Sequence, residues 1–285
     1  MAATTSTQQV LKLTPSRLRD YLVCRRRFEQ QHLRLHSAEN GSASVARPQE
    51  TASMAFGNSL HAVLDALHKG PDEHSDVSTQ ADRVADLLSL HWRGKGYADK
   101  ETEDAAFLEA SSVLKYYVRS PHVPSGTLLG TELYLSCHAT IAHRKVELSA
   151  RIDRLELHPE GLLEALDYKT NRDGQVPSAS TLASDLPSFI YFLVVWHHYS
   201  SDPRVLNVAL SQLNLMSLSK TRVQYDQRHI VAHKAALIDV VASITAEEFQ
   251  PRVNKSCAWC PVRESCPAWG ELNLDDLTDS GVRST

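Results

Sequence analysis

The chain of 285 residues lacks any apolar run long enough to span a bilayer. Its longest run, Phe189 to Trp196, is far shorter than the roughly 20 residues that a spanning helix needs. Residues 1–9 are polar and contain no hydrophobic signal region. We therefore expect a soluble cytoplasmic protein that does not associate with membranes.

The sequence also lacks an excess of positive charge. Its formal net charge is −4, so any binding of nucleic acid has to rely on local basic patches. Five cysteines, an odd number with uneven spacing, argue against a secreted disulfide framework. No G-x-x-x-x-G-K-S/T loop is present, so we expect any nucleotide-driven motor to be supplied by a partner.

Two strands and a tight turn stand out in the middle of the sequence. From Val146 to Leu157, apolar and polar residues alternate, which predicts a β-strand with one buried face. A second strand is expected from Leu162 to Thr170. Pro159-Glu160-Gly161 between them predicts a hairpin.

This hairpin brings acidic and basic side chains together. Asp153 lies on the first strand, and Asp167 and Lys169 share a face of the second. Two carboxylates on adjacent strands can hold a hard divalent cation through oxygen. A lysine beside them can orient a water or stabilise charge on a phosphoryl oxygen. The alternative is an ordinary solvated strand face.

Two further residues are candidates because of their surroundings. Glu132 interrupts the apolar segment Leu129–Leu135, and it needs a metal or a cationic partner if it points inward. It can equally face solvent. His61 lies beside the apolar stripe of a helix expected from Ser53 to Lys69, where packing or capping is the alternative to binding a metal.

Near the C-terminus, Cys257, Cys260 and Cys266 form a C-x2-C-x5-C motif. Closely spaced thiolates in a cytoplasmic protein favour a soft metal or an iron–sulfur cluster. Cys24 is the expected fourth ligand, because Cys137 lies near the end of an apolar strand and is interpreted as a core residue. Structural zinc and free thiols are the alternatives.

Cys24 belongs to an arginine-rich helix expected from Pro15 to about Leu35. Arg25, Arg26 and Arg27 follow it directly, which predicts a surface that contacts phosphates. The alternative is a solvated charged face.

In this order, the motifs resemble the RecB-like branch of the PD-(D/E)xK nuclease superfamily, specifically its iron–sulfur members, such as the AddB nuclease domain and the CRISPR-adaptation nucleases. The resemblance covers Leu13 to Trp269. The matching segments are the N-terminal helix with its isolated cysteine (Leu13–Cys24), G-x-x-x-H (Gly57–His61), the G-x-I-D-R strand (Ala150–Arg154), D-Y-K-T (Asp167–Thr170) and the C-terminal cysteine motif (Cys257–Cys266).

The resemblance implies a role for each of these residues. Mg²⁺ or Mn²⁺ would be held by His61, Asp153, Asp167 and the backbone carbonyl of Tyr168, with Lys169 catalytic and Glu132 a helper. A structural [4Fe-4S] cluster would be bound by Cys24, Cys257, Cys260 and Cys266. DNA would be contacted by Arg25, Arg26, Arg27 and Tyr191.

The sequence departs from the family pattern at two positions. Ala150 replaces the usual glycine before the aspartate strand. The apolar helix expected from Thr181 to Tyr199 keeps Tyr191 but has Pro187 where relatives carry the glutamine of a Q-x-x-x-Y motif. Gln175 is a candidate substitute for that glutamine.

The resemblance implies an α/β fold with a PD-(D/E)xK restriction-endonuclease-like core, in which helices flank a mixed central sheet. We expect one domain over residues 13–270, with a helical insertion at about 53–120, a sheet core at about 127–250 and a cysteine-stapled segment at 257–266. Residues 1–12 and 271–285 are expected to be disordered or flexible.

The implied function is metal-dependent hydrolysis of DNA, as an exonuclease on single-stranded ends in repair or recombination. One alternative is a nuclease for CRISPR spacer acquisition. The other is an inactive DNA-end-binding partner of a helicase.

Overall fold

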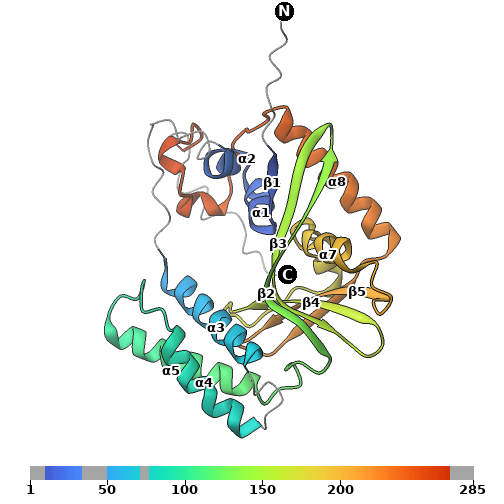
Figure 1. The fold of residues 1–285 in the computed structure, drawn as a ribbon. Coiled ribbons are helices and arrows are strands. Elements are labelled where there is room, and N and C mark those ends of the chain that lie inside the picture. The colour runs from blue at the N-terminus through green and yellow to red at the C-terminus, as the bar shows by residue number, and fades with distance from the viewer. Residues whose placement is uncertain (1–9, 34–49, 71–76, 270–285) are drawn as a thin grey trace, which may run out of the picture. The chain divides into compact units, whose positions relative to one another are not determined.

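The computed structural model describes residues 10–33, 50–70 and 77–269 (Figure 1). The chain divides into two compact units, which are described separately. The larger comprises residues 49–137 and 148–234, and the smaller comprises 1–48, 138–147 and 235–285. Among the described helices, none combines the length and the apolar character needed to cross a membrane.

The larger unit contains a mixed β-sheet. Its strands are β2 (Thr127–Ile141), β3 (Arg144–Leu157), β4 (Leu162–Lys169), β5 (Asn207–Asn214) and β6 (Lys220–Gln224), with the tip of the β2–β3 hairpin assigned to the smaller unit. The order is β3-β4-β5-β6, with β2 pairing β3. Strand β4 is antiparallel to β3 and parallel to β5, and β6 is antiparallel to β5. The predicted hairpin is therefore confirmed.

Helices pack on both faces of this sheet (Figure 1). They are α3 (Ala52–Lys69), α4 (Val77–His91), α5 (Lys100–Tyr117), α6 (Ala179–Ser184) and α7 (Leu186–Tyr199). Helix α8 (Gln227–Thr245) follows β6 and continues into the smaller unit. The apolar sides of α3, α4 and α5 share one buried core with Leu166, Tyr168 and Leu213 of the sheet. Helix α7 packs on β4 and β5. The expected mixed sheet flanked by helices is confirmed.

The helix expected from Thr181 to Tyr199 is instead two helices separated at Asp185. Asp185 caps α7, since its carboxylate accepts a hydrogen bond from the backbone N–H of Ser188 at 2.9 Å. Pro187 lies in the first turn of α7, where its missing N–H costs no intrahelical hydrogen bond. The cap and the proline together explain the break.

The smaller unit contains β1 (Leu11–Leu13), α1 (Pro15–Val23), α2 (Arg25–Phe28) and a π-helical turn (Glu29–Leu33). It also holds two short 3-10 helices, Lys255–Trp259 and Arg263–Ser265. Residues 11 and 12, expected to be disordered, belong to β1. The remaining calls of disorder or flexibility, on residues 1–9 and 271–285, lie outside the described residues.

The single helix expected from Pro15 to about Leu35 is wrong at Cys24. There the backbone is extended (φ −161°, ψ 117°), which ends α1, and α2 begins at Arg25. The backbone N–H of Cys24 still donates a hydrogen bond to the carbonyl of Asp20 at 2.9 Å, which caps the end of α1. This extended residue changes the direction of the chain, so the arginines do not continue the face of α1.

A buried cluster of charges stabilises the β3–β4 hairpin next to its turn. Glu164 is 1% exposed and contacts Lys220 at 2.7 Å, Arg222 at 2.9 Å and His158 at 2.9 Å. Despite burial, hydrogen bonds from Arg222 and Lys220 hold the pKa of Glu164 well below its usual range. Glu156, His158 and Glu164 lie close enough to hold a metal, but two cationic side chains already neutralise Glu164. The cluster is therefore structural.

Replacing Glu164 with glutamine is expected to lower the free energy of unfolding by about 3 kcal/mol, because it leaves the largely buried Lys220 ammonium without its carboxylate. Urea denaturation of the metal-free protein measures this change. Glu160→Gln, in the exposed turn of the same hairpin, is the control and should change it little. A change below about 0.5 kcal/mol for Glu164→Gln would show that the cluster is not stabilising.

Candidate active site and cysteine pocket

Three side chains from separate elements of the larger unit converge at one point. Nδ1 of His61 lies 3.4 Å from an oxygen of Asp153 and 3.6 Å from an oxygen of Glu132. Each of the three residues offers one possible ligand atom, and these three atoms all lie within 4.8 Å of one another. The three residues line a cleft of about 720 Å³. A single metal ion at this point would contact all three.

Helix α3 presents His61 because it approaches the end of β4 closely. A Cβ added to Gly57, one turn before His61, would lie 3.0 Å from Oγ1 of Thr170. A side chain at this position would therefore require the Thr170 hydroxyl or the helix to shift by a few tenths of an ångström. In the G-x-x-x-H motif, the glycine thus allows α3 to lie close to the end of β4, and the histidine on the same helix contacts Asp153.

Glu132 reaches the site through an unusual backbone conformation. Its φ is +49°, in the left-handed region, in the middle of strand β2. For a residue other than glycine this conformation costs about 1–2 kcal/mol. It interrupts the regular alternation of the strand and redirects the side chain, as bulges near active sites do. The sequence left the direction of Glu132 open, and in the structure it faces His61 and Asp153.

Asp167 lies beside this group and has its own partners. It is 6% exposed, and its Oδ2 is 2.6 Å from Nζ of Lys169. Burial raises the pKa of the Asp167 carboxyl above its usual range, a shift that Lys169 opposes and the charge of Asp153 reinforces. Asp167 is not among the three residues whose ligand atoms meet within 4.8 Å. Its role as a metal ligand stays a prediction.

Gln212 of β5 also contacts this carboxylate, donating from Nε2 to Oδ2 of Asp167 at 3.2 Å. Sequence reasoning missed this residue. Its one signal is a polar amide in the largely apolar segment Val208–Leu213, where Ser211 precedes it. Gln175, the substitute considered from sequence, lies in a loop and donates instead to the carbonyl of Asp173 at 3.4 Å.

Tyr168 joins the two acidic strands. Its backbone N–H donates to Oδ2 of Asp153 at 2.7 Å. The N–H and C=O of a strand residue point to the same side, so its carbonyl also faces β3, as the expected ligand role requires. Its hydroxyl is buried and contacts Tyr117 at 2.9 Å and Arg154 at 3.4 Å. This buried contact fixes the middle of the D-Y-K-T segment.

The donor set of His61, Glu132 and Asp153 suits Mg²⁺ or Mn²⁺, which prefer carboxylate oxygens, with imidazole more acceptable to Mn²⁺. Burial lowers the pKa of His61, but its contacts with Asp153 and Glu132 outweigh that effect and raise the pKa to about 10. Without a metal, His61 therefore carries a proton that offsets the two carboxylates. A metal ion would take the place of that proton.

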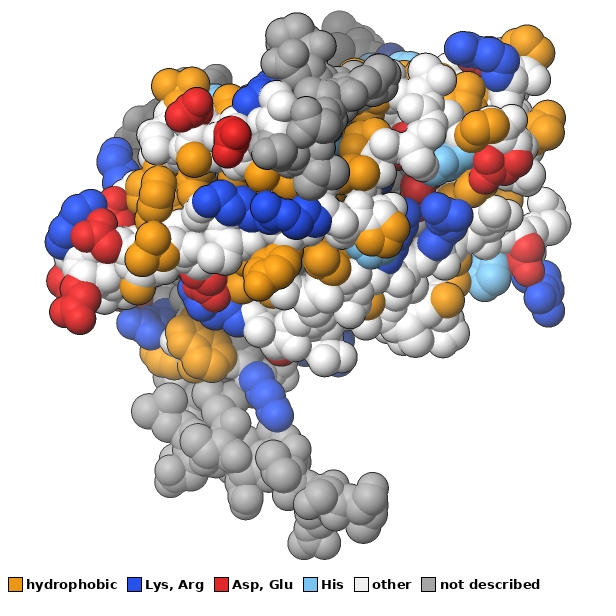
Figure 2. Space-filling model, turned by 90° about the horizontal axis from the view of Figure 1, so that it is seen from below, with side chains coloured by type: hydrophobic (Ala, Val, Ile, Leu, Met, Phe, Trp, Pro, Cys, Tyr) orange, Lys and Arg blue, Asp and Glu red, His pale blue; other side chains and the backbone are white. Residues whose placement is uncertain are grey.

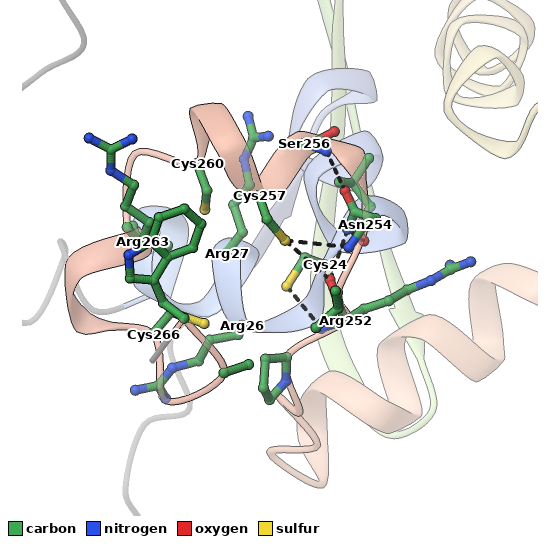
Figure 3. A pocket seen from close by; sticks show the side chains of 16 residues that line it. Cys24, Arg26, Arg27, Arg252, Asn254, Ser256, Cys257, Cys260, Arg263 and Cys266 are labelled. Carbon is green, nitrogen blue, oxygen red and sulfur yellow. Dashed lines mark hydrogen bonds between the residues drawn. The ribbon is translucent and has the colours of Figure 1, made fainter. Parts of the chain in front are cut away.

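The smaller unit holds a second site, a pocket lined by all four predicted cysteines. Figure 3 shows the sulfur atoms of Cys24, Cys257, Cys260 and Cys266 around one space. The backbone N–H of Arg252 donates to Sγ of Cys24, and that of Asn254 donates to Sγ of Cys257, each at 3.4 Å. Cys137 is buried on β2, in the larger unit, and does not line this pocket.

Four arginine residues belong to the lining of this pocket. Arg26, Arg27, Arg252 and Arg263 line the same pocket (Figure 3). Burial raises the pKa of the Cys260 thiol, and the guanidinium of Arg27 opposes that shift. Guanidinium groups close to thiols favour the thiolate form, which is the form that binds metals.

The sequence predicts that Arg25, Arg26 and Arg27 contact DNA, but in the structure their guanidinium groups have other partners. Each of the three is paired with an acid of the smaller unit: Arg25 with Glu248 at 3.2 Å, Arg26 with Glu29 at 2.6 Å and Arg27 with Asp20 at 2.9 Å. Binding a phosphate would require these pairs to exchange, so this role stays a prediction. Tyr191 is half-buried on α7, and its role also stays a prediction.

On the face drawn in Figure 2, basic side chains of the described residues are interspersed with acidic and hydrophobic ones. No broad patch of one sign covers the described part of that face. This distribution agrees with the slightly negative net charge.

Comparison with known proteins shows the family of the chain. The family model described as "PD-(D/E)XK nuclease superfamily" matches residues 12–267 of the chain. The chain belongs to this superfamily. The resemblance expected from the motifs is thus confirmed at the level of the superfamily, whose members are typically nucleases that use a divalent metal.

A search of the curated proteins gives no match. Among solved structures, the chain is similar to one titled "Crystal structure of SSO0001", with 11% identity over 82% of this chain and 92% of that chain. The TM-score is 0.33, which is too low to bear on function.

The left-handed backbone at Glu132 has a measurable consequence. We expect Glu132→Gly to be more stable than Glu132→Ala by about 1 kcal/mol, because glycine adopts a positive φ without steric cost. Denaturant unfolding without metal gives this difference. At the exposed strand residue Lys145 the order should be reversed, with alanine more stable than glycine. Higher stability of Glu132→Ala would contradict the assigned backbone strain.

Proposed function

We propose that this protein is a metal-dependent deoxyribonuclease, and that it hydrolyses phosphodiester bonds at single-stranded DNA ends. The observation that carries the proposal is the convergence of His61, Glu132 and Asp153 beside the Asp167–Lys169 pair. Superfamily membership supports the nuclease activity. The preference for single-stranded ends rests on the resemblance of the motifs to the RecB-like branch.

His61, Glu132 and Asp153 would hold the divalent ion, with Asp167 and the Tyr168 carbonyl completing its ligands. A bound ion supplies Lewis acidity, which polarises the phosphate and lowers the pKa of a nearby water. Lys169 lies next to Asp167 and is one-third exposed, so its ammonium group would be accessible to a phosphate held by the ion. There it orients the attacking water or offsets the charge that develops on the phosphoryl oxygens.

The rim of the cleft supplies positive charge for a nucleic-acid backbone. Lys69, Arg93 and Arg151 line it, and each has a side chain more than half exposed. Lys69 is paired with Asp65, Arg93 with Glu50 and Arg151 with Glu132 of the proposed metal site, and the exposed cation of each pair can exchange its partner readily. Phosphates of a strand entering the cleft can therefore compete for these three cations.

The four-cysteine pocket is proposed to hold a structural [4Fe-4S] cluster. The support is the meeting of four cysteines from both ends of the chain, the two N–H donors to sulfur and the surrounding arginines. A single zinc ion requires sulfur atoms about 3.8 Å apart. Zinc held by the same four thiolates is the alternative. Such a thiolate-bound group also fits the reducing cytoplasm expected from the sequence.

The nuclease proposal predicts that end-labelled single-stranded DNA is cut in Mg²⁺ or Mn²⁺ and left intact in EDTA. Asp167→Ala should abolish cutting. Lys169→Met, which keeps the length but removes the charge, should lower kcat at least about 100-fold. The exposed strand residue Lys145 provides the matched control, since Lys145→Met should retain full activity. Equal cutting by wild type and Asp167→Ala would contradict the proposal.

The cluster proposal predicts that protein purified without oxygen is brown and contains about four irons per chain. Cys24→Ser should lose both the colour and the iron. Cys137→Ser removes another buried thiol that lies outside the pocket, and it should keep both. Zinc in place of iron in the wild type, or iron retained by Cys24→Ser, would contradict the cluster.

A further inference from the structure

Gln212 lies in β5 directly beside Asp167. The parallel register of β4 and β5 pairs Asp167 with Gln212, and the antiparallel register of β5 and β6 pairs Gln212 with Thr221. Gln212 is 7% exposed. A buried amide needs polar partners, since leaving one unpaired costs about 1–3 kcal/mol. Here the Nε2 group finds its partner in the carboxylate of Asp167.

Two donors of different character converge on Oδ2 of Asp167. Lys169 approaches at 2.6 Å with a full positive charge, and Gln212 approaches at 3.2 Å with a neutral amide. A charged donor both orients a carboxylate and neutralises it. A neutral donor orients it while leaving its charge available to a cation. Gln212 is therefore the partner that can remain in place when Asp167 turns from Lys169 to a metal ion.

We propose that Gln212 is a positioning residue for the metal site, and that it keeps its hydrogen bond to the Asp167 carboxylate when that carboxylate turns from Lys169 toward the ion. This inference rests on the proposed function, since it assumes that Asp167 is a metal ligand of the nuclease. Hydrogen-bonded partners of ligating carboxylates typically contribute 10- to 100-fold to metal affinity. Gln212 does not itself touch the substrate or the ion.

The test is direct binding of Mn²⁺ to the full-length protein, measured by the loss of the electron paramagnetic resonance signal of free Mn²⁺. Gln212→Met keeps the length of the side chain but removes the donor. It should weaken Mn²⁺ binding about tenfold. Gln224→Met makes the same change at an exposed position of β6, and it should bind as tightly as wild type.

A second variant covers a failure of Gln212→Met to fold. Gln212→Asn keeps the amide and shortens the side chain by one methylene, which withdraws the donor from Asp167. It too should weaken Mn²⁺ binding about tenfold, while its melting temperature without metal shows that it is folded. A merely structural role would change that melting temperature and leave the affinity of the folded protein unchanged.

Wild-type affinity in the folded Gln212 variants would overturn the role of Gln212, even if the wild type cleaves DNA. An equal loss in Gln224→Met would overturn it as well. A tenfold loss confined to the Gln212 variants would support it, even if the wild type cleaves no DNA. The cleavage assay therefore judges the nuclease, and the binding assay judges Gln212.

Discussion

The candidate site of the larger unit requires two carboxylates, which repel each other, to lie on adjacent strands. Asp153 on β3 and Asp167 on β4 each raise the electrostatic cost of the other, and burial adds to that cost for Asp167. The protein offsets their charge from four directions: with the N–H of Tyr168, the ammonium of Lys169, the amide of Gln212 and the protonated ring of His61. In the absence of a divalent ion, these four groups offset the negative charge of the two carboxylates.

The parts of this site that could be predicted from sequence are local along the chain. Alternation gave the two strands, Gly161 marked their turn, and Asp167 and Lys169 had to share a face because they are two residues apart. The convergence on His61 could not be derived from periodicity, because it depends on how closely α3 approaches β4 at Gly57. The left-handed φ of Glu132 and the extended backbone of Cys24 each depart from a regular pattern. Helical spacing therefore wrongly predicted a continuous helix through Cys24, and the strand pattern left the direction of Glu132 open.

Each unit carries its own kind of chemistry with its own residues. The larger unit gathers carboxylates and an imidazole, which suit a hard divalent ion. The smaller unit gathers four thiols among arginines, which suit a soft metal or an iron–sulfur cluster. Pro187 occupies the start of α7, at the position of the glutamine in the RecB-like motif that the sequence resembles. The amide that reaches Asp167 comes from β5, through Gln212.

We propose that His61, Glu132 and Asp153 form one divalent-metal site. Its most direct test is anomalous diffraction from crystals grown in Mn²⁺. We expect one strong Mn²⁺ peak about 2.2 Å from Nδ1 of His61 and from an oxygen of each of the two acids, with Asp167 turned toward it. A peak at Glu156, His158 and Glu164 instead, or no peak among His61, Glu132 and Asp153, would contradict the account.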